Sequence, residues 1–176
     1  GITLSFQSMN EDVLRNIGRQ NISLSFFSEL MDLYNEAGVA TYTELILGLP
    51  GETYDSFVNG IAKLFEIGQH KLFEVYHCIV LPNSKLGQKD YIKKHGIKTS
   101  RAEIVRFHCP ADAYYIPEKV NIITQTATMP CKDWQRCGLF AGFTQLMHAV
   151  GLLRCLAIYA YYELGVSYRA FYEGLT

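Results

Sequence analysis

The 176 residues suffice for one domain with a buried core, and 49% of them are hydrophobic, an ordinary share for a globular protein. The net charge of −1 argues against nucleic acid or an anionic membrane surface as a partner. Five cysteines, an odd number without a regular framework, are typical of reduced thiols in a cytoplasmic protein, and their spacing predicts no metal site.

The first strand begins with the chain itself. Residues 2–8 alternate apolar and polar side chains, which predicts a strand with one apolar and one polar face. Because chain ends are usually loose, a chain that opens inside a strand indicates an excised piece of a longer protein.

Two helices are predicted next. Asn10 is a suitable N-cap for a short amphipathic helix that Gly18 ends. Ser23 or Ser25 begins the following helix, and Gly38 ends it in the usual way.

A strand predicted over residues 39–47 leads into the central strand–turn–helix joint of the chain. The run from Glu44 to Thr53 passes from an apolar strand through a Gly-Leu-Pro-Gly turn to the start of a helix, with Thr53 as N-cap. The helix extends to about residue 67, where Gly68 ends it. In α/β barrels, ligands bind at such joints at the carboxyl ends of the strands.

A third strand is predicted over residues 72–81, so residues 1–84 form a β-α-α-β-α-β unit with parallel strands and right-handed crossovers. A polar strand face is not typical of a flat sheet that helices cover on both sides. It favours a barrel with helices outside and ligand inside. The side chains that we expect to line the interior are Gln7, Glu44, Tyr76 and Cys78.

The pattern changes after residue 84. We expect irregular sequence over residues 85–118 with a short helix near 87–95, then a strand over 118–128, and then helices over 130–149, 152–164 and 167–173. The apolar run 139–164 favours a buried helical pair, since polar residues and two glycines interrupt it too often for a membrane span. A surface that docks on another domain is the remaining alternative.

Several of these motifs occur together in one known superfamily. Gln7-Ser8 after an apolar strand, Ile17-Gly18-Arg19 in the next helix, and the Leu45–Thr53 run resemble the radical S-adenosylmethionine (SAM) superfamily. The resemblance is closer to its cobalamin-associated branch, which includes proteins similar to anaerobic magnesium-protoporphyrin IX monomethyl ester cyclases. The ending Val80–Ser84 belongs to the same pattern, whereas residues 85–176 match more loosely.

The resemblance implies an α/β fold in which residues 1–84 are the last three βα units of a partial TIM-type (βα)6 barrel. Residues 85–176 would be a mainly helical C-terminal extension. The family's Cys-x3-Cys-x2-Cys loop, which holds a [4Fe–4S] cluster, is absent from this sequence. The resemblance therefore implies a missing N-terminal half of the barrel that holds the cluster, and a chain that is inactive alone.

The resemblance also implies a SAM-binding site. By family position, Gln7 and Ser8 would lie near the SAM ribose or methionine end, and Glu44 would face the cavity. The residues implied beside adenine are Ile46, Gly48 and Leu81, with Gly48 allowing close approach. Each also has a structural explanation: Gly48 can serve only the turn, Ile46 can be core, and Glu44 can pair with a cation from the missing half.

Two functions of different classes follow. The first is a radical SAM iron–sulfur oxidoreductase or transferase that cleaves SAM to act on an unknown small molecule, with cobalamin as an additional cofactor that the sequence does not decide. The second is a docking module whose aromatic tail contacts a partner. An anion-binding barrel is a third alternative, although the turn lacks the usual phosphate-loop patterns. Open strand edges further predict that the isolated chain forms a homodimer or covers an edge with its tail.

Overall fold

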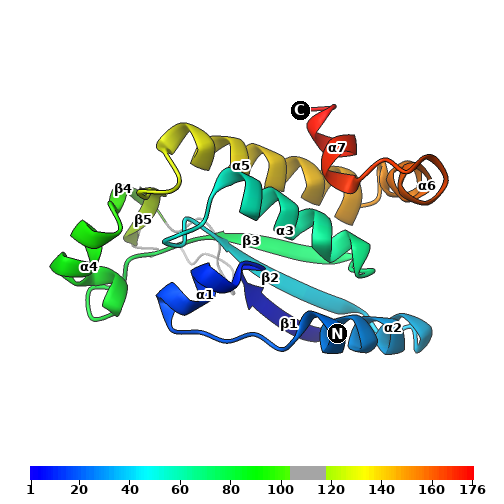
Figure 1. The fold of residues 1–176 in the computed structure, drawn as a ribbon, viewed down its shortest axis with the longest axis horizontal. Coiled ribbons are helices and arrows are strands. Elements are labelled where there is room, and N and C mark those ends of the chain that lie inside the picture. Colours follow the sequence, from blue (N-terminus) through cyan, green and yellow to red (C-terminus); the bar gives the residue numbers. More distant parts are fainter. Residues whose placement is uncertain (104–117) are drawn as a thin grey trace, which may run out of the picture.

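The computed structural model describes residues 1–103 and 118–176 and has a mixed α/β fold (Figure 1). A parallel sheet with the strand order β1–β2–β3 comprises β1 (Ile2–Gln7), β2 (Thr41–Leu47) and β3 (Leu72–His77). The predicted order of strands and helices over residues 1–84 and the parallel pairing are confirmed. The third strand was predicted too long: it ends at His77, and residue 79 forms only an isolated bridge.

Local capping determines where the first helices begin: α1 (Glu11–Ile17), α2 (Leu24–Glu36) and α3 (Tyr54–Glu66). The Asn10 side chain accepts hydrogen bonds from the first turn of α1, and the Ser23 side chain does the same for α2. Thr53 forms a reciprocal capping box with Ser56 at the start of α3. Of the two serines predicted for α2, Ser23 is thus the cap.

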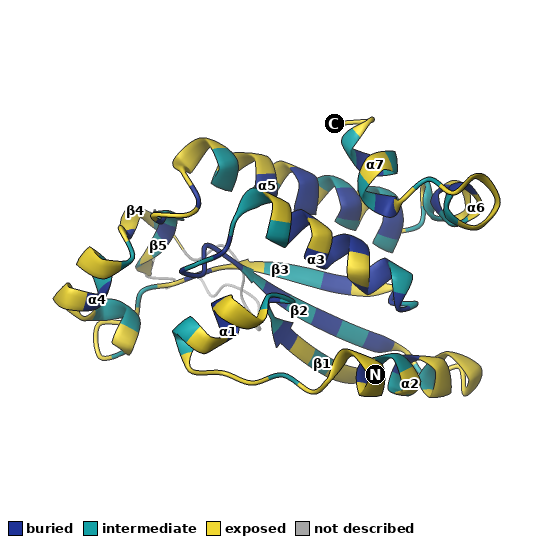
Figure 2. Ribbon diagram, in the orientation of Figure 1, coloured by how far each residue is buried: buried dark blue, intermediate teal, exposed yellow. Residues whose placement is uncertain are grey.

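Helices cover one face of the sheet. Alternate residues of β2 are buried (Figure 2), and two of them, Leu45 and Leu47, join side chains of α2, α3 and α5 (Cys131–Thr144) in one apolar cluster. The largest members of the cluster are Phe6, Phe27, Phe57, Phe65, Phe73, Phe140, Tyr168 and Tyr172. Since α5 and α7 (Tyr168–Glu173) contribute to this cluster, the extension packs against residues 1–84. The proposed boundary near residue 84 stays a prediction.

The opposite face of the sheet is more polar and more exposed. Thr3 and Ser5 are exposed on β1, and Tyr42 and Glu44 are partly buried on β2. Glu44 and Glu74 are partners in the parallel register. This face has the polar character that the sequence predicted for it.

The extension contains more strand than predicted. It comprises η1 (Lys85–Gly87), α4 (Lys89–Lys94), β4 (Lys98–Glu103), β5 (Lys119–Gln125), α5 (Cys131–Thr144), the π-helix η2 (Gln145–Ala149), α6 (Arg154–Leu164) and α7 (Tyr168–Glu173). The β5 prediction is confirmed, whereas β4, which pairs antiparallel with β5, was predicted as irregular. The part of that prediction on residues 104–117 lies outside the described residues.

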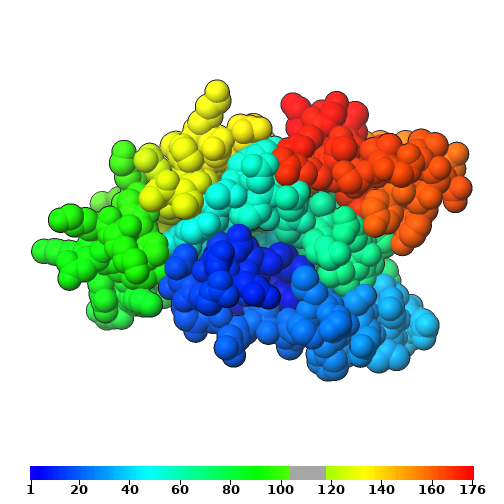
Figure 3. Space-filling view, viewed as in Figure 1, coloured from blue at the N-terminus to red at the C-terminus, as the bar shows by residue number. Residues whose placement is uncertain are grey.

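The apolar run of the extension is only partly buried, so the predicted buried helical pair is wrong for α6. Ala157 and Ala160 face the interior, but Leu156, Tyr159 and Tyr162 are exposed. In the space-filling view, α6 projects at one end of the molecule (Figure 3). Within the described residues no single helix is long and apolar enough to cross a membrane. Only Cys131–Ala149 and Arg154–Leu164 together pass that test, and they are bent by 93°.

Candidate functional site

The extension meets the carboxyl ends of the strands. The chain after β3 forms an antiparallel bridge with β5, in which the Ile123 N–H donates to the Cys78 carbonyl and the Val80 N–H donates to the Asn121 carbonyl, both at 2.8 Å. Val13, Leu49, Cys78, Tyr91, Ile97 and Ile123 form a second apolar cluster there. Cys78, predicted to line an interior, is therefore buried beneath β5, and burial raises the pKa of its thiol to about 12. The tail thus pairs with the segment that follows β3, beyond the end of the strand itself.

Gly48 ends β2 in a conformation that only glycine adopts easily. Its φ is +102°, and a Cβ at this position would lie 3.0 Å from the Ile123 carbonyl oxygen and 3.5 Å from the Cys78 Cβ. The close approach that this structure shows is therefore by β5. The predicted contact of Gly48 with adenine stays a prediction.

Gln7 ends β1 in a γ-turn. The Ser8 N–H donates to the Phe6 carbonyl at 2.6 Å, and Gln7 between them has a φ of +57°. γ-Turns with positive φ are rare and strained. The Asn21 side-chain amide donates to both flanking carbonyls, those of Phe6 and Ser8, at 2.9 Å each.

Ser8 is buried and faces the protein interior. Its hydroxyl donates to the Glu52 carboxylate at 2.6 Å and accepts from the Asn10 N–H at 3.1 Å. Ser56 also donates to the Glu52 carboxylate, and the Thr128 hydroxyl donates to the Glu52 carbonyl at 2.7 Å. Burial raises the pKa of Glu52, although the two hydroxyl donors partly offset that effect. Glu52 therefore connects the end of β1, the start of α3 and the segment after β5.

The other predicted contact residues are more dispersed. Glu44 accepts a hydrogen bond from Ser5 on the polar face of the sheet. Ile46, on the same face, is partly buried and packs against the second apolar cluster. Leu81 lies four residues past the end of β3 and is 61% exposed. The structure thus brings Gln7, Ser8 and Gly48 to one edge of the sheet and leaves Leu81 at its periphery.

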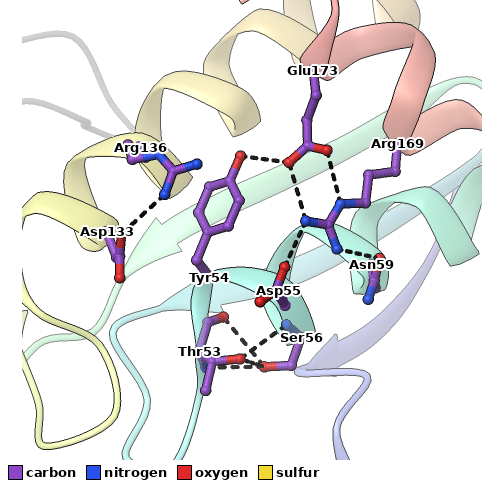
Figure 4. Close-up of polar contacts among 9 residues, drawn as sticks. All are labelled: Thr53, Tyr54, Asp55, Ser56, Asn59, Asp133, Arg136, Arg169 and Glu173. Carbon is purple, nitrogen blue, oxygen red and sulfur yellow. Dashed lines mark hydrogen bonds and ion pairs between the residues drawn. The ribbon is translucent and has the colours of Figure 1, made fainter.

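The start of α3 is tied to the C-terminal helix α7. Arg169 of α7 contacts the Asp55 carboxylate at 2.6 Å and donates to Asn59 at 3.0 Å (Figure 4). The Tyr54 hydroxyl donates to Glu173 at 2.8 Å. The helix that follows the Gly-Leu-Pro-Gly turn is thereby held by α7 as well.

The amino ends of the strands carry a different polar cluster. His148 in η2 is fully buried, stacks on Phe65, and lies 3.0 Å from a ring nitrogen of His70 and 2.7 Å from the Tyr172 hydroxyl. Burial, with smaller contributions from His70 and Arg154, lowers the pKa of His148 to about 3. No predicted ligand residue belongs to this cluster, which joins η2 to α3 and α7.

No metal centre is visible among residues 1–103 and 118–176. There, no three His, Cys, Asp or Glu side chains are grouped as a metal site would require. A cavity of about 430 Å³ lies between α1 and the start of α2, and its lining includes Phe6, Arg19 and Asn21 but none of the predicted contact residues.

Two residues of this site were missed as contributors. The sequence analysis placed Glu52 within the joint but gave it no role, and Asn21 was not singled out. Asn21 lies 13 residues beyond Ser8 and Glu52 lies 44 beyond it. The signal available for Glu52 was an acidic residue between a glycine and a helix cap within an apolar joint.

Comparison with known proteins supplies the family context. The chain is 38% identical to the cobalamin-dependent radical SAM methyltransferase TokK of Streptomyces tokunonensis over 177 aligned residues. It is 36% identical, over the same length, to the 2-(S-pantetheinyl)-carbapenam-3-carboxylate methyltransferase of Streptantibioticus cattleyicolor. The resemblance to cobalamin-associated radical SAM proteins is confirmed.

The matches cover nearly all of this chain but only part of each relative. Each alignment covers 99% of this chain but 26% of the relative, so the chain spans about a quarter of the length of the curated relatives it matches. The matches include residues 85–176, where the sequence motifs alone gave a looser resemblance. No family model matches the chain.

Proposed function

We propose that this chain is the C-terminal part of a cobalamin-dependent radical SAM methyltransferase. The observation that supports this most strongly is the similarity over 99% of the chain, at 38% identity, to an enzyme of that description. In this proposal the three parallel strands are part of a larger barrel whose first strands lie outside the chain. The polar face of the sheet would then face the barrel interior.

The residues at the carboxyl edge fit SAM in their chemistry. Gln7 has an amide that both donates and accepts hydrogen bonds, as ribose hydroxyls require, and Ile46 offers an apolar surface for adenine. Within this proposal SAM supplies both the methyl group and, on reductive cleavage, the radical that the superfamily uses. The cluster and cobalamin would be bound by parts of the protein outside residues 1–103 and 118–176.

The substrate is proposed by similarity alone. The relative from Streptantibioticus cattleyicolor is named for 2-(S-pantetheinyl)-carbapenam-3-carboxylate. This compound, and simpler pantetheine thioethers, are the first substrates to test. Transfer of the SAM methyl group to such a compound would make the enzyme a transferase.

A docking role remains the second candidate, on narrower evidence than the sequence suggested. Most of the aromatic tail packs inside the fold, including Phe140, Tyr168 and Tyr172. Tyr159 and Tyr162 are exposed and adjoin Leu156, so α6 retains an apolar outer surface. This surface favours a contact between α6 and another part of the longer protein.

The test uses the complete protein, reconstituted anaerobically with iron, sulfide and cobalamin. We expect 5′-deoxyadenosine under reducing conditions and transfer of isotope-labelled methyl from SAM to the carbapenam. 5′-Deoxyadenosine without methyl transfer would retain the superfamily and reject the methyltransferase assignment. Neither product, in a preparation with intact cluster absorption and bound cobalamin, would favour the docking role.

A further inference from the structure

β1 ends in a backbone conformation that is strained for Gln7, and a turn at this position does not require it. Among residues 1–103 and 118–176, Gln7 is the one non-glycine residue with a positive φ. Every other positive φ in this part of the chain belongs to glycine, including Gly48 at the end of the neighbouring strand. Glycine at position 7 would form the same turn with less strain.

Two side chains hold this strained turn from both sides. Asn21 bridges the carbonyls of Phe6 and Ser8, which flank Gln7. Glu52 accepts from the Ser8 hydroxyl, and the Asn10 N–H donates to the same hydroxyl. The backbone on either side of Gln7 is therefore fixed by hydrogen bonds from three different segments.

The buried Glu52 carboxylate, which accepts the Ser8 hydrogen bond, is a costly way to stabilise the fold. Glu52 is 1% exposed, and among the described residues it forms no ion pair. Burying a carboxylate without a cation destabilises the fold, whereas a neutral amide could have accepted the same hydrogen bond. A strained residue and an uncompensated carboxylate at one strand end are typical of a site where geometry matters more than stability.

The position of the turn indicates what this geometry serves. Gln7 lies at the carboxyl edge of the parallel sheet, where α/β folds bind their ligands. Among the described residues, its side-chain amide forms no hydrogen bond. The amide is thus held in place by its backbone while its own donors and acceptor remain available.

We propose that Asn21 and Glu52 are positioning residues that hold the Gln7 turn, so that the Gln7 amide meets SAM with a fixed orientation. This inference rests on the proposed function. It goes further by assigning roles to two residues that have no contact with the ligand. They act only through Gln7, which makes the inference testable by a double-mutant cycle.

The test measures the Kd of SAM and the Tm of the complete, reconstituted protein. Asn21→Ala is expected to weaken SAM binding about three- to tenfold, the range for loss of a hydrogen-bonded arrangement. In a Gln7→Ala background, Asn21→Ala should weaken it no further. Glu52→Leu, which cannot accept the Ser8 hydrogen bond, should follow the same pattern. If Glu52→Leu does not fold, Ser8→Ala replaces it, because it removes the same contact.

Gln7→Gly separates strain from binding. We expect its Tm to equal or exceed that of the wild type, because the turn loses its strain, while SAM binding weakens as in Gln7→Ala. Asn35→Ala is the matched control, since Asn35 donates a similar bond to the Gly68 carbonyl at the opposite edge of the sheet. It should leave the Kd unchanged.

Each alternative outcome has a definite meaning. If the wild type binds SAM and the Asn21 and Glu52 variants lower Tm without changing the Kd, both residues are merely structural and the inference is wrong. Equal weakening by Asn21→Ala in both backgrounds would also overturn it, since the effect would not pass through Gln7. A wild type that fails to bind SAM would overturn the proposed function as well.

Discussion

Two neighbouring strands of one sheet end in opposite ways. β2 leaves the extended conformation at Gly48, a residue that accepts positive φ without strain, and β5 packs closely over it. β1 leaves the extended conformation at Gln7, which also has a positive φ. Hydrogen bonds of Asn21 and of the buried Glu52 hold the residues on either side of it. The β2 end is therefore constrained by packing, whereas the β1 end is constrained by polar contacts that hold a glutamine where glycine would be less strained.

The largest effect is expected where the packing constraint is broken. Gly48→Ala adds a Cβ 3.0 Å from the Ile123 carbonyl oxygen in a backbone region that side chains rarely adopt. Strain and overpacking together should lower the free energy of unfolding by about 3 kcal/mol. Urea unfolding of the 176-residue chain measures this loss.

Gly18→Ala provides the matched control for that prediction. Gly18 also has a positive φ, +71°, but nothing lies within 4 Å of its added Cβ. Only conformational strain remains, so the loss should be about 1 kcal/mol. Equal losses at the two glycines would show that β5 does not constrain the β2 end.

The second largest effect is on the pH dependence of stability, to which the amino ends and the carboxyl ends of the strands contribute differently. His148 stays neutral in the folded state down to about pH 3, whereas an unfolded histidine takes up a proton near pH 6.5. Between these values the unfolded chain binds more protons, so stability falls as the pH falls. One proton corresponds to about 1.4 kcal/mol per pH unit. Because the unfolded histidine is only half protonated at pH 6.5, the loss between pH 6.5 and 4.5 is about 2.3 kcal/mol.

Glu52 contributes with the opposite sign. Because burial raises its pKa, the folded state retains a proton that the unfolded chain has lost, and this contribution to stability disappears as the pH rises above about 4.5. Urea midpoints measured from pH 4.5 to 7 should therefore lose their acid slope in His148→Gln and gain slope in Glu52→Gln. His95→Gln, at a less buried histidine, is the control. An unchanged profile in His148→Gln would exclude this histidine as the source of acid sensitivity.

The sequence predicted the local features of this comparison well. Asn10, Ser23 and Thr53 cap helices where expected, and the Gly-Leu-Pro-Gly joint follows β2 as its residue types require. These features depend on neighbours within four residues, where composition is decisive.

The features that were missed depend on distant partners. β4 is rich in polar and charged residues, and its pairing with β5 overrides that local preference. The exposure of α6 depends on which neighbours cover it, which its own apolar sequence does not specify. The contacts of Glu52 and Asn21 likewise join segments far apart in the chain. The periodicity of a helix or a strand does not predict such contacts.

The smallest expected effect concerns the hydrogen bond that attaches the extension to the joint after β2. Thr128 donates a 2.7 Å hydrogen bond to the Glu52 carbonyl, and Thr128→Val removes that donor while keeping the shape of the side chain. A loss of about 1 kcal/mol in the free energy of unfolding is expected in urea. Thr124→Val is the control, because its hydroxyl contact with Ser100 is exposed and 3.3 Å long, and it should change stability by less than about 0.5 kcal/mol. If both valine variants unfold at the same urea concentration, the Thr128 bond does not help fix Glu52. Asn10, Ser8 and Ser56 would then be sufficient to hold the carboxyl edge, and the β1 end would be independent of the extension.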